Sequence, residues 1–198
     1  MLKKTLHNYN IILASGSPRR QEFFRLLDLD FTIDVREVEE VYSAETLKKA
    51  AITDYLAQLK ASVFENLSEN DILITSDTIV WKDGAAIGKP INKEDARSML
   101  EGLSGETHEV FTSVSFTSKH FQKTINDSTK VWFKTLTEEE IEYYLTNYQP
   151  YDKAGSYGIQ DWLGYIGIER IEGCFFNVMG LPTRLVYKTL MDIAARSF

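Results

Sequence analysis

Short apolar runs alternate along the chain with longer stretches in which apolar residues recur every three or four positions. The short runs are typical of buried strands, and the longer stretches are typical of amphipathic helices. This alternation predicts an α/β fold. The expected strands are residues 10–14, 31–35, 71–76, 110–116, 130–134 and 166–171, together with a hairpin of residues 79–81 and 85–87 around the Asp83-Gly84 turn signal.

Periodicity and capping residues predict five helices. Pro18 is suited to a first helical turn, and Thr137 with Glu140 forms a capping-box signature. Since hairpin signals and longer crossovers occur in the same chain, we expect a mixed sheet. The expected helices are residues 18–28, 44–66, 92–102, 137–147 and 181–195.

Length and composition favour a single soluble domain. The 198 residues contain no repeat, low-complexity tract or linker, so we expect one domain over residues 1–198. The net charge of −7 argues against general nucleic-acid binding, which requires a basic face. A local basic pocket for a small anion remains compatible with it.

Targeting and metal-binding signals of the common kinds are missing from the sequence. Cys174 is the single cysteine and the three histidines are scattered, which excludes an internal disulfide and disfavours a zinc site. The start of the chain has no apolar signal-peptide core, and no apolar run reaches membrane-spanning length. We therefore expect a cytoplasmic protein with no membrane partner.

The sharpest local signal is the stretch A-S-G-S-P-R-R at 14–20, where a strand is expected to end and a helix to begin. Unpaired N–H groups at a helix start favour an anion, and arginine adds donors that match phosphate oxygens. Ser15, Ser17, Arg19 and Arg20 are therefore candidates for a phosphate site. The alternative is an ordinary solvated helix N-terminus.

A second signal is Ser76-Asp77-Thr78, expected at the end of a buried strand. Strand ends are common ligand positions in α/β proteins. Asp77 is thus a candidate to bind Mg²⁺ or to deprotonate an attacking water. The alternative is that Asp77 only forms a turn.

Four further residues complete a plausible nucleotide site. Lys89 lies in a stiff G-K-P segment, and Lys60 flanks the apolar stripe of its helix, where an ordinary surface lysine is the alternative. Glu40, in an acidic run, is either a solvated side chain or a Mg²⁺ ligand. Gln160 ends a glycine-rich loop and could read a base edge. Together these residues suggest a site for a nucleoside triphosphate and a metal.

Seven motifs, in order along nearly the whole chain, resemble the Maf family. They are L-A-S-G-S-P-R-R at 13–20, L-A-Q-L-K-A at 56–61, S-D-T at 76–78, G-K-P at 88–90, L-S-G-E-T-H-E-V at 103–110, D-K-A-G-S-Y-G-I-Q at 152–160 and I-E-G…N-V-M-G-L-P at 171–182. The resemblance implies an inosine-triphosphatase-like fold, with an elongated mixed sheet flanked by helices and a central cleft between two lobes. It also implies a homodimer.

The resemblance further implies hydrolysis of a nucleoside triphosphate between its α- and β-phosphates, with Mg²⁺ or Mn²⁺. Asp77 then matches the general base, and the role of metal ligand stays open for it. The remaining matches are the basic cleft residues Arg20, Lys60 and Lys89, the acidic residue Glu40, and the phosphate-loop hydroxyls of Ser15 and Ser17.

Three positions distinguish the branches of the family. Arg19, Thr78 and Gln160 match the branch that acts on dTTP and UTP. The alternatives are a 7-methyl-GTP pyrophosphatase and a non-catalytic nucleotide-binding regulator of septum formation. The chain departs from the family pattern at Asp161-Trp162, where glycine is usual after the glutamine, and we expect an altered base pocket there.

Overall fold

The computed structural model describes residues 2–195, which fold into two compact units. The first unit contains residues up to Asp77, Thr112–Asp127 and residues from Gly180; the second contains Thr78–Phe111 and Ser128–Met179. Three long strands run from one unit into the other: β3 (Asp71–Lys82), β5 (Thr107–Thr117) and β6 (Gln122–Phe133).

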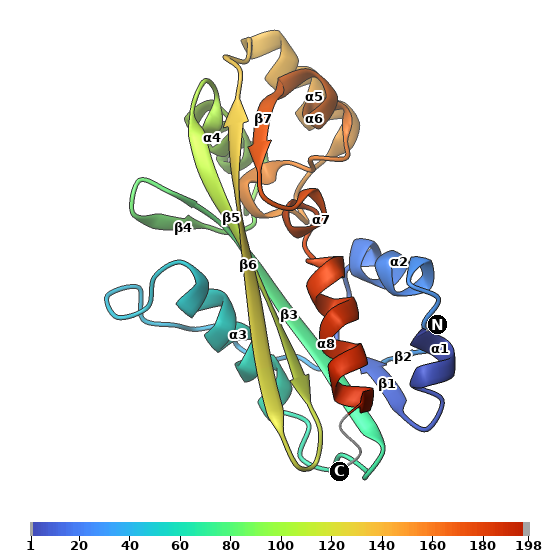
Figure 1. The fold of residues 1–198 in the computed structure, drawn as a ribbon. Coiled ribbons are helices and arrows are strands. Elements are labelled where there is room, and N and C mark those ends of the chain that lie inside the picture. Colours follow the sequence, from blue (N-terminus) through green and yellow to red (C-terminus); the bar gives the residue numbers. More distant parts are fainter. Residues whose placement is uncertain (1, 196–198) are drawn as a thin grey trace. The chain divides into compact units, whose positions relative to one another are not determined.

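The first unit contains the N-terminal helices and strands and the last helix (Figure 1). In Figure 1, α3 and α8 lie on opposite sides of β3, and α1 packs against α8. The elements are α1 (Leu2–Thr5), β1 (Asn10–Leu13), α2 (Pro18–Leu26), β2 (Thr32–Ile33), α3 (Ala50–Ser62) and α8 (Thr183–Ala195).

The second unit packs three helical segments together, since α4 contacts both α5 and η1. Its core contains the buried aromatic side chains of Phe133, Tyr144 and Tyr157. The elements are β4 (Ala85–Ile87), α4 (Lys93–Leu103), α5 (Glu138–Tyr148), η1 (Ala154–Ser156), α6 (Trp162–Gly167), β7 (Ile168–Glu172) and α7 (Phe175–Val178).

Within residues 2–195 the sheet is mixed and has seven strands, in the order β2-β1-β3-β5-β6-β7 with β4 paired to β3. β1 runs parallel to β2 and β3, whereas β4 and β7 pair antiparallel with β3 and β6. The α/β class and the mixed sheet flanked by helices are therefore confirmed. The hairpin at Asp83-Gly84 is confirmed as well, with both residues at positive φ.

Several expected boundaries were wrong. The helix expected at 44–66 spans only Ala50–Ser62, because Lys49 before it has a φ of 55° that is incompatible with a continuous helix. The strand expected at 31–35 is only Thr32–Ile33. Strand β6 begins at Gln122 rather than 130, since its first residues are mostly polar and half-exposed and so lack an apolar pattern.

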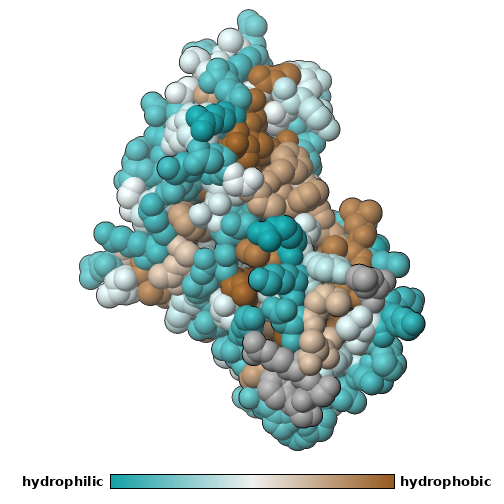
Figure 2. All heavy atoms as spheres, viewed as in Figure 1, coloured by the Kyte–Doolittle hydropathy of each residue, from teal (hydrophilic) through white to brown (hydrophobic). Residues whose placement is uncertain are grey.

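The face of the molecule drawn in Figure 2 is mostly polar, since hydrophilic residues cover much of it. Among the helices of residues 2–195, none is both long and apolar enough to cross a membrane.

Candidate active site

Asp77 lies within a strand and not at a strand end, which corrects the prediction. Strand β3 continues to Lys82 because Ile79 and Val80 are buried and extend the apolar pattern past the polar residues. The pairing of β1 with β3 nevertheless ends at Leu13 opposite Ile74. Asp77 thus lies just beyond the carboxyl end of β1, where α/β proteins commonly bind ligands.

Strand alternation turns Asp77 toward helix α3. Side chains two residues apart in a strand point to the same face of the sheet, so the side chain of Asp77 points to the same face as that of Thr75. The Thr75 hydroxyl donates a 2.6 Å hydrogen bond to the carbonyl of Ala57 in α3, which places the helix directly against the strand. Lys60, one turn further along α3, therefore reaches Asp77.

Lys60 connects two carboxylates that are far apart in the sequence. Its Nζ lies 2.7 Å from Asp77 Oδ1 and 3.1 Å from Glu40 Oε1. Asp77 is 7% exposed, so Lys60 rather than water must stabilise its negative charge. The Glu40 side chain is 50% exposed and is also stabilised by water. The structure therefore brings together Lys60, Asp77 and Glu40, three of the predicted residues.

The second carboxylate oxygen of Asp77 carries an unmet hydrogen-bonding capacity. Oδ2 is buried and has no hydrogen-bond partner among residues 2–195. A buried acceptor without a partner is unfavourable and is unusual in a core built only for stability. The Oδ2 atom is therefore available to a water or a cation.

The serine-rich turn caps helix α2. Ser17 is the N-cap and its hydroxyl accepts from the Arg20 N–H at 3.5 Å, while the Ser15 hydroxyl accepts from the Ser17 N–H at 3.3 Å. Pro18 occupies the first helical turn, as predicted. The helix start expected from the sequence is confirmed, and both serine hydroxyls have local hydrogen-bond partners.

The Arg20 guanidinium holds two backbone segments beside Asp77. Nε donates to the carbonyl of Gly180 at 2.8 Å, and Nη1 donates to the carbonyl of Ser76 at 3.0 Å. Burial lowers the pKa of Arg20 to about 10, the Asp77 charge opposes this shift, and the Arg19 charge adds to it. Arg20 therefore stays charged at neutral pH. No local pattern predicts the Gly180 contact, because the two residues lie 160 positions apart.

Lys89, Thr78 and Gln160 belong to the second unit. There the Gly155 N–H donates to the carbonyl of Gly88 at 2.9 Å, which ties the loop carrying Lys89 to the loop that leads to Gln160. Lys89 is exposed and Gln160 is half-buried. Thr78 follows Asp77 in β3, so alternation points its side chain to the opposite face of the strand.

The acidic residues of the first unit supply too few ligands to bind Mg²⁺ or Mn²⁺ without substrate. Within residues 2–195, no group of three or more His, Cys, Asp or Glu side chains is placed to hold a metal. Mg²⁺ is usually held by one or two carboxylates, with substrate phosphates and waters completing its shell. Glu40 and the unpartnered Oδ2 of Asp77 fit that pattern, with substrate as a required ligand.

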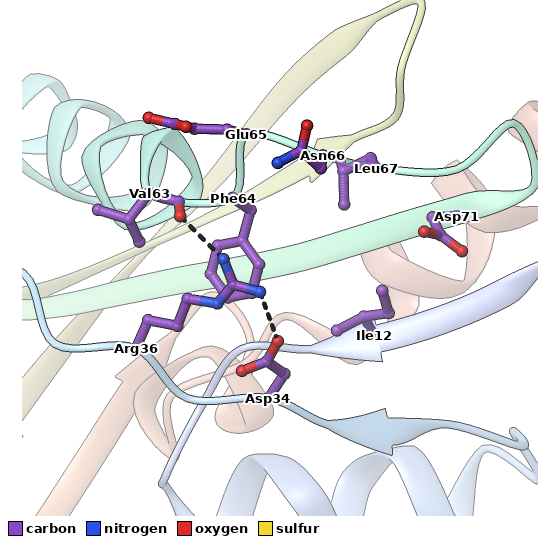
Figure 3. A pocket seen from close by; sticks show the side chains of 9 residues that line it. All are labelled: Ile12, Asp34, Arg36, Val63, Phe64, Glu65, Asn66, Leu67 and Asp71. Atoms are coloured by element: carbon purple, nitrogen blue, oxygen red, sulfur yellow. Dashed lines mark hydrogen bonds and ion pairs between the residues drawn. The ribbon is translucent and has the colours of Figure 1, made fainter.

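A separate pocket of about 330 Å³ lies in the first unit beside the end of α3 (Figure 3). Its arginine, Arg36, is already engaged: the guanidinium donates to Asp34 and to the Val63 carbonyl, each at 3.0 Å, and lies over the Phe64 ring. Glu65 and Asp71 add negative charge to the lining. This pocket is therefore a poor phosphate site.

Residues 10–193 match the family of Maf-like proteins. The chain belongs to this family. The resemblance inferred from the seven motifs is thereby confirmed.

Curated Maf-like relatives match the chain over nearly its full length. A protein of Christiangramia forsetii named dTTP/UTP pyrophosphatase is 59% identical over 194 residues, covering 98% of both chains. Proteins with the same name from Flavobacterium psychrophilum and Bacteroides thetaiotaomicron are 55% and 46% identical, covering 97% and 95% of this chain and 98% of each relative.

One solved structure is a more distant match. It is titled as a nucleoside-triphosphatase / dITP/XTP pyrophosphatase from Mycobacterium abscessus, and it covers 94% of this chain and 97% of its own. The identity is 14% and the TM-score is 0.43.

Proposed function

We propose that this Maf-like protein hydrolyses dTTP and UTP to the nucleoside monophosphate and pyrophosphate. The observation that carries the proposal is the setting of the buried Asp77 carboxylate. One of its oxygens is ion-paired to Lys60, and the other has no hydrogen-bond partner among residues 2–195. The names of the relatives supply the substrates.

Asp77 orients and deprotonates the attacking water in this proposal. Lys60 holds Oδ1 at 2.7 Å, so the carboxylate has a fixed direction and presents Oδ2 to the water. A positioned general base of this kind contributes about 10²–10⁴-fold to a rate.

Positive groups near Asp77 stabilise the phosphates. Lys60 and Arg20 both stay close to the carboxylate, and Arg20 keeps its charge at neutral pH because its pKa is about 10. The N-terminus of α2, capped by Ser17, adds the positive end of a helix dipole. We assign Lys89 a further phosphate contact from the family resemblance.

Glu40 would hold Mg²⁺ or Mn²⁺ together with the substrate phosphates, because Lys60 occupies Oδ1 of Asp77 and Oδ2 faces the attacking water in this proposal. The metal supplies charge neutralisation of the triphosphate when it is bound. Because Lys60 contacts one oxygen of each carboxylate, it also keeps the two acidic groups near each other before substrate arrives.

Arg19, Thr78 and Gln160 select the base in this proposal, because they match the dTTP/UTP branch. The chain would act in the cytoplasm as a homodimer that removes unwanted nucleotides from the pool. Analytical ultracentrifugation tests the dimer directly.

The test of the substrate assignment is a panel of nucleoside triphosphates with Mg²⁺, in which pyrophosphate and orthophosphate are measured separately. We expect pyrophosphate and a monophosphate from dTTP and UTP, and little turnover of 7-methyl-GTP. Orthophosphate as the first product would contradict cleavage between the α- and β-phosphates. Preference for 7-methyl-GTP would contradict the branch assignment.

A further inference from the structure

The amide of Gln160 is held in one orientation by the next residue. Its Nε2 donates to Asp161 Oδ1 at 3.1 Å. An ionised carboxylate only accepts hydrogen bonds, so the nitrogen end of the amide must face Asp161. The other end, Oε1, is buried and has no hydrogen-bond partner among residues 2–195.

Asp161 is itself fixed by the core of the second unit. The Tyr144 hydroxyl donates to Asp161 Oδ2 at 2.8 Å and accepts from the Gly158 N–H at 3.0 Å. Burial, with the Asp161 charge as a second cause, raises the pKa of Tyr144, which keeps the phenol protonated as a donor. Lys153 Nζ lies 3.7 Å from the same carboxylate oxygen.

Two local features show that the Asp161 side chain is committed to this network. Asp161 occupies the N-cap position of α6, where aspartate usually caps the helix, yet its side chain makes no capping bond. A Cβ on Gly158 would lie 2.5 Å from Asp161 Oδ2 and 2.7 Å from Gln160 Nε2. Glycine at 158 therefore leaves the space that the network occupies.

We propose that Asp161 is a positioning residue that makes Gln160 specific for a pyrimidine with an N3–H group. With Nε2 held by Asp161, Oε1 is the end of the amide left to meet the base. Uracil and thymine donate from N3 to such an acceptor, whereas N3 of cytosine is an acceptor and repels it. This inference rests on the proposed function, in which Gln160 contacts the base.

The variant Asp161→Asn tests the orientation with little change of shape. The Tyr144 hydroxyl accepts a hydrogen bond from the Gly158 N–H and donates its own hydrogen to residue 161. In the variant the carbonyl oxygen of the new amide must accept this hydrogen, so the oxygen faces Tyr144. The NH₂ of the new amide then faces Gln160, whose amide turns over and presents Nε2 to the base. We expect the ratio of kcat/KM for UTP over CTP to fall by a factor of about ten to one hundred.

Asp161→Ala provides a second variant, because it frees the Gln160 amide without reversing it. We expect a smaller fall in the same ratio, of about tenfold. The control is Glu142→Gln, which breaks the ion pairs of Glu142 with Lys93 and Arg97 elsewhere in the unit and leaves the ratio unchanged. A merely structural role of Asp161 would lower both kcat/KM values together, so an unchanged ratio overturns the inference.

Calorimetric binding of UTP and CTP separates this inference from the proposed function. If the wild-type protein cleaves neither nucleotide, the proposed function fails, and the relative binding constants decide the inference. A preference for UTP that falls in Asp161→Asn supports it. Equal binding, absent binding or an unchanged preference overturns it.

Discussion

Replacing Lys60 with methionine removes the cation between Asp77 and Glu40. Methionine keeps the apolar stem against α3, so the loss is chiefly that of the ammonium group. Asp77 is 7% exposed and would keep a buried negative charge with its 2.7 Å partner gone. Glu40 is half-exposed and can rely on water.

The size of the effect follows from the burial of the pair. Breaking a buried ion pair on one side costs roughly 3–5 kcal/mol. The Lys60 side chain is 18% exposed and Arg20 also lies near Asp77, so we expect the lower end, about 3 kcal/mol. With a urea m-value of about 3 kcal/mol/M for a chain of this size, the midpoint should fall by about 1 M.

The assay is urea unfolding of the wild type, Lys60→Met, Asp77→Asn and the double variant. The double variant lacks the orphaned charge, so we expect it to be more stable than Lys60→Met alone. The coupling free energy between the two positions should reach about 1–3 kcal/mol. A cost below about 0.5 kcal/mol for Lys60→Met, or no coupling, would refute the argument that Lys60 holds Asp77 in place.

Three further predictions concern other parts of the molecule. Burial, with a smaller contribution from Lys82, lowers the pKa of His108 from 6.5 to about 4, so between these pH values unfolding takes up a proton at His108. The free energy of unfolding measured with urea should therefore fall by about 3 kcal/mol between pH 7 and pH 4 through this one residue. The variant His108→Gln should lack this part of the loss. Thr137→Ala removes the capping box with Glu140 and should cost about 1 kcal/mol in urea unfolding, while a neutral result would show that α5 does not depend on its cap. Glu40→Gln should raise the Mg²⁺ concentration needed for half-maximal activity with little change in stability, and an unchanged Mg²⁺ titration would exclude Glu40 as a metal ligand.

Local signals in the sequence predicted the starts of α2 and α5 well. Pro18, with Ser17 before it, and Thr137 with Glu140 act through hydrogen bonds within one turn, and both caps are present in the structure. The long strand β3 was cut short because Ser76 and Asp77 are polar yet buried. Their burial depends on α3 and on partners such as Lys60, which periodicity along the strand does not report.

Three candidate residues that the structure brings together could be singled out from the sequence, but the contacts between them could not. Lys60, Asp77 and Glu40 were each singled out, and their ion pairs depend on the packing of α3 on β3. Asp161 was noted only as a departure from the family pattern, and its hydrogen bond with Tyr144 was missed because the two residues lie 17 positions apart and meet only in the folded chain. The six-residue helix α6 that follows was missed as well, since its glycines disfavour a helix.

The most direct test of the central claim is the rate of pyrophosphate release from dTTP by Asp77→Asn, measured beside the wild type with saturating Mg²⁺. The loss of a general base predicts a fall in kcat of about 10²–10⁴-fold, with a folded variant and retained nucleotide binding. A variant that keeps the wild-type kcat would contradict the assignment of hydrolysis to Asp77.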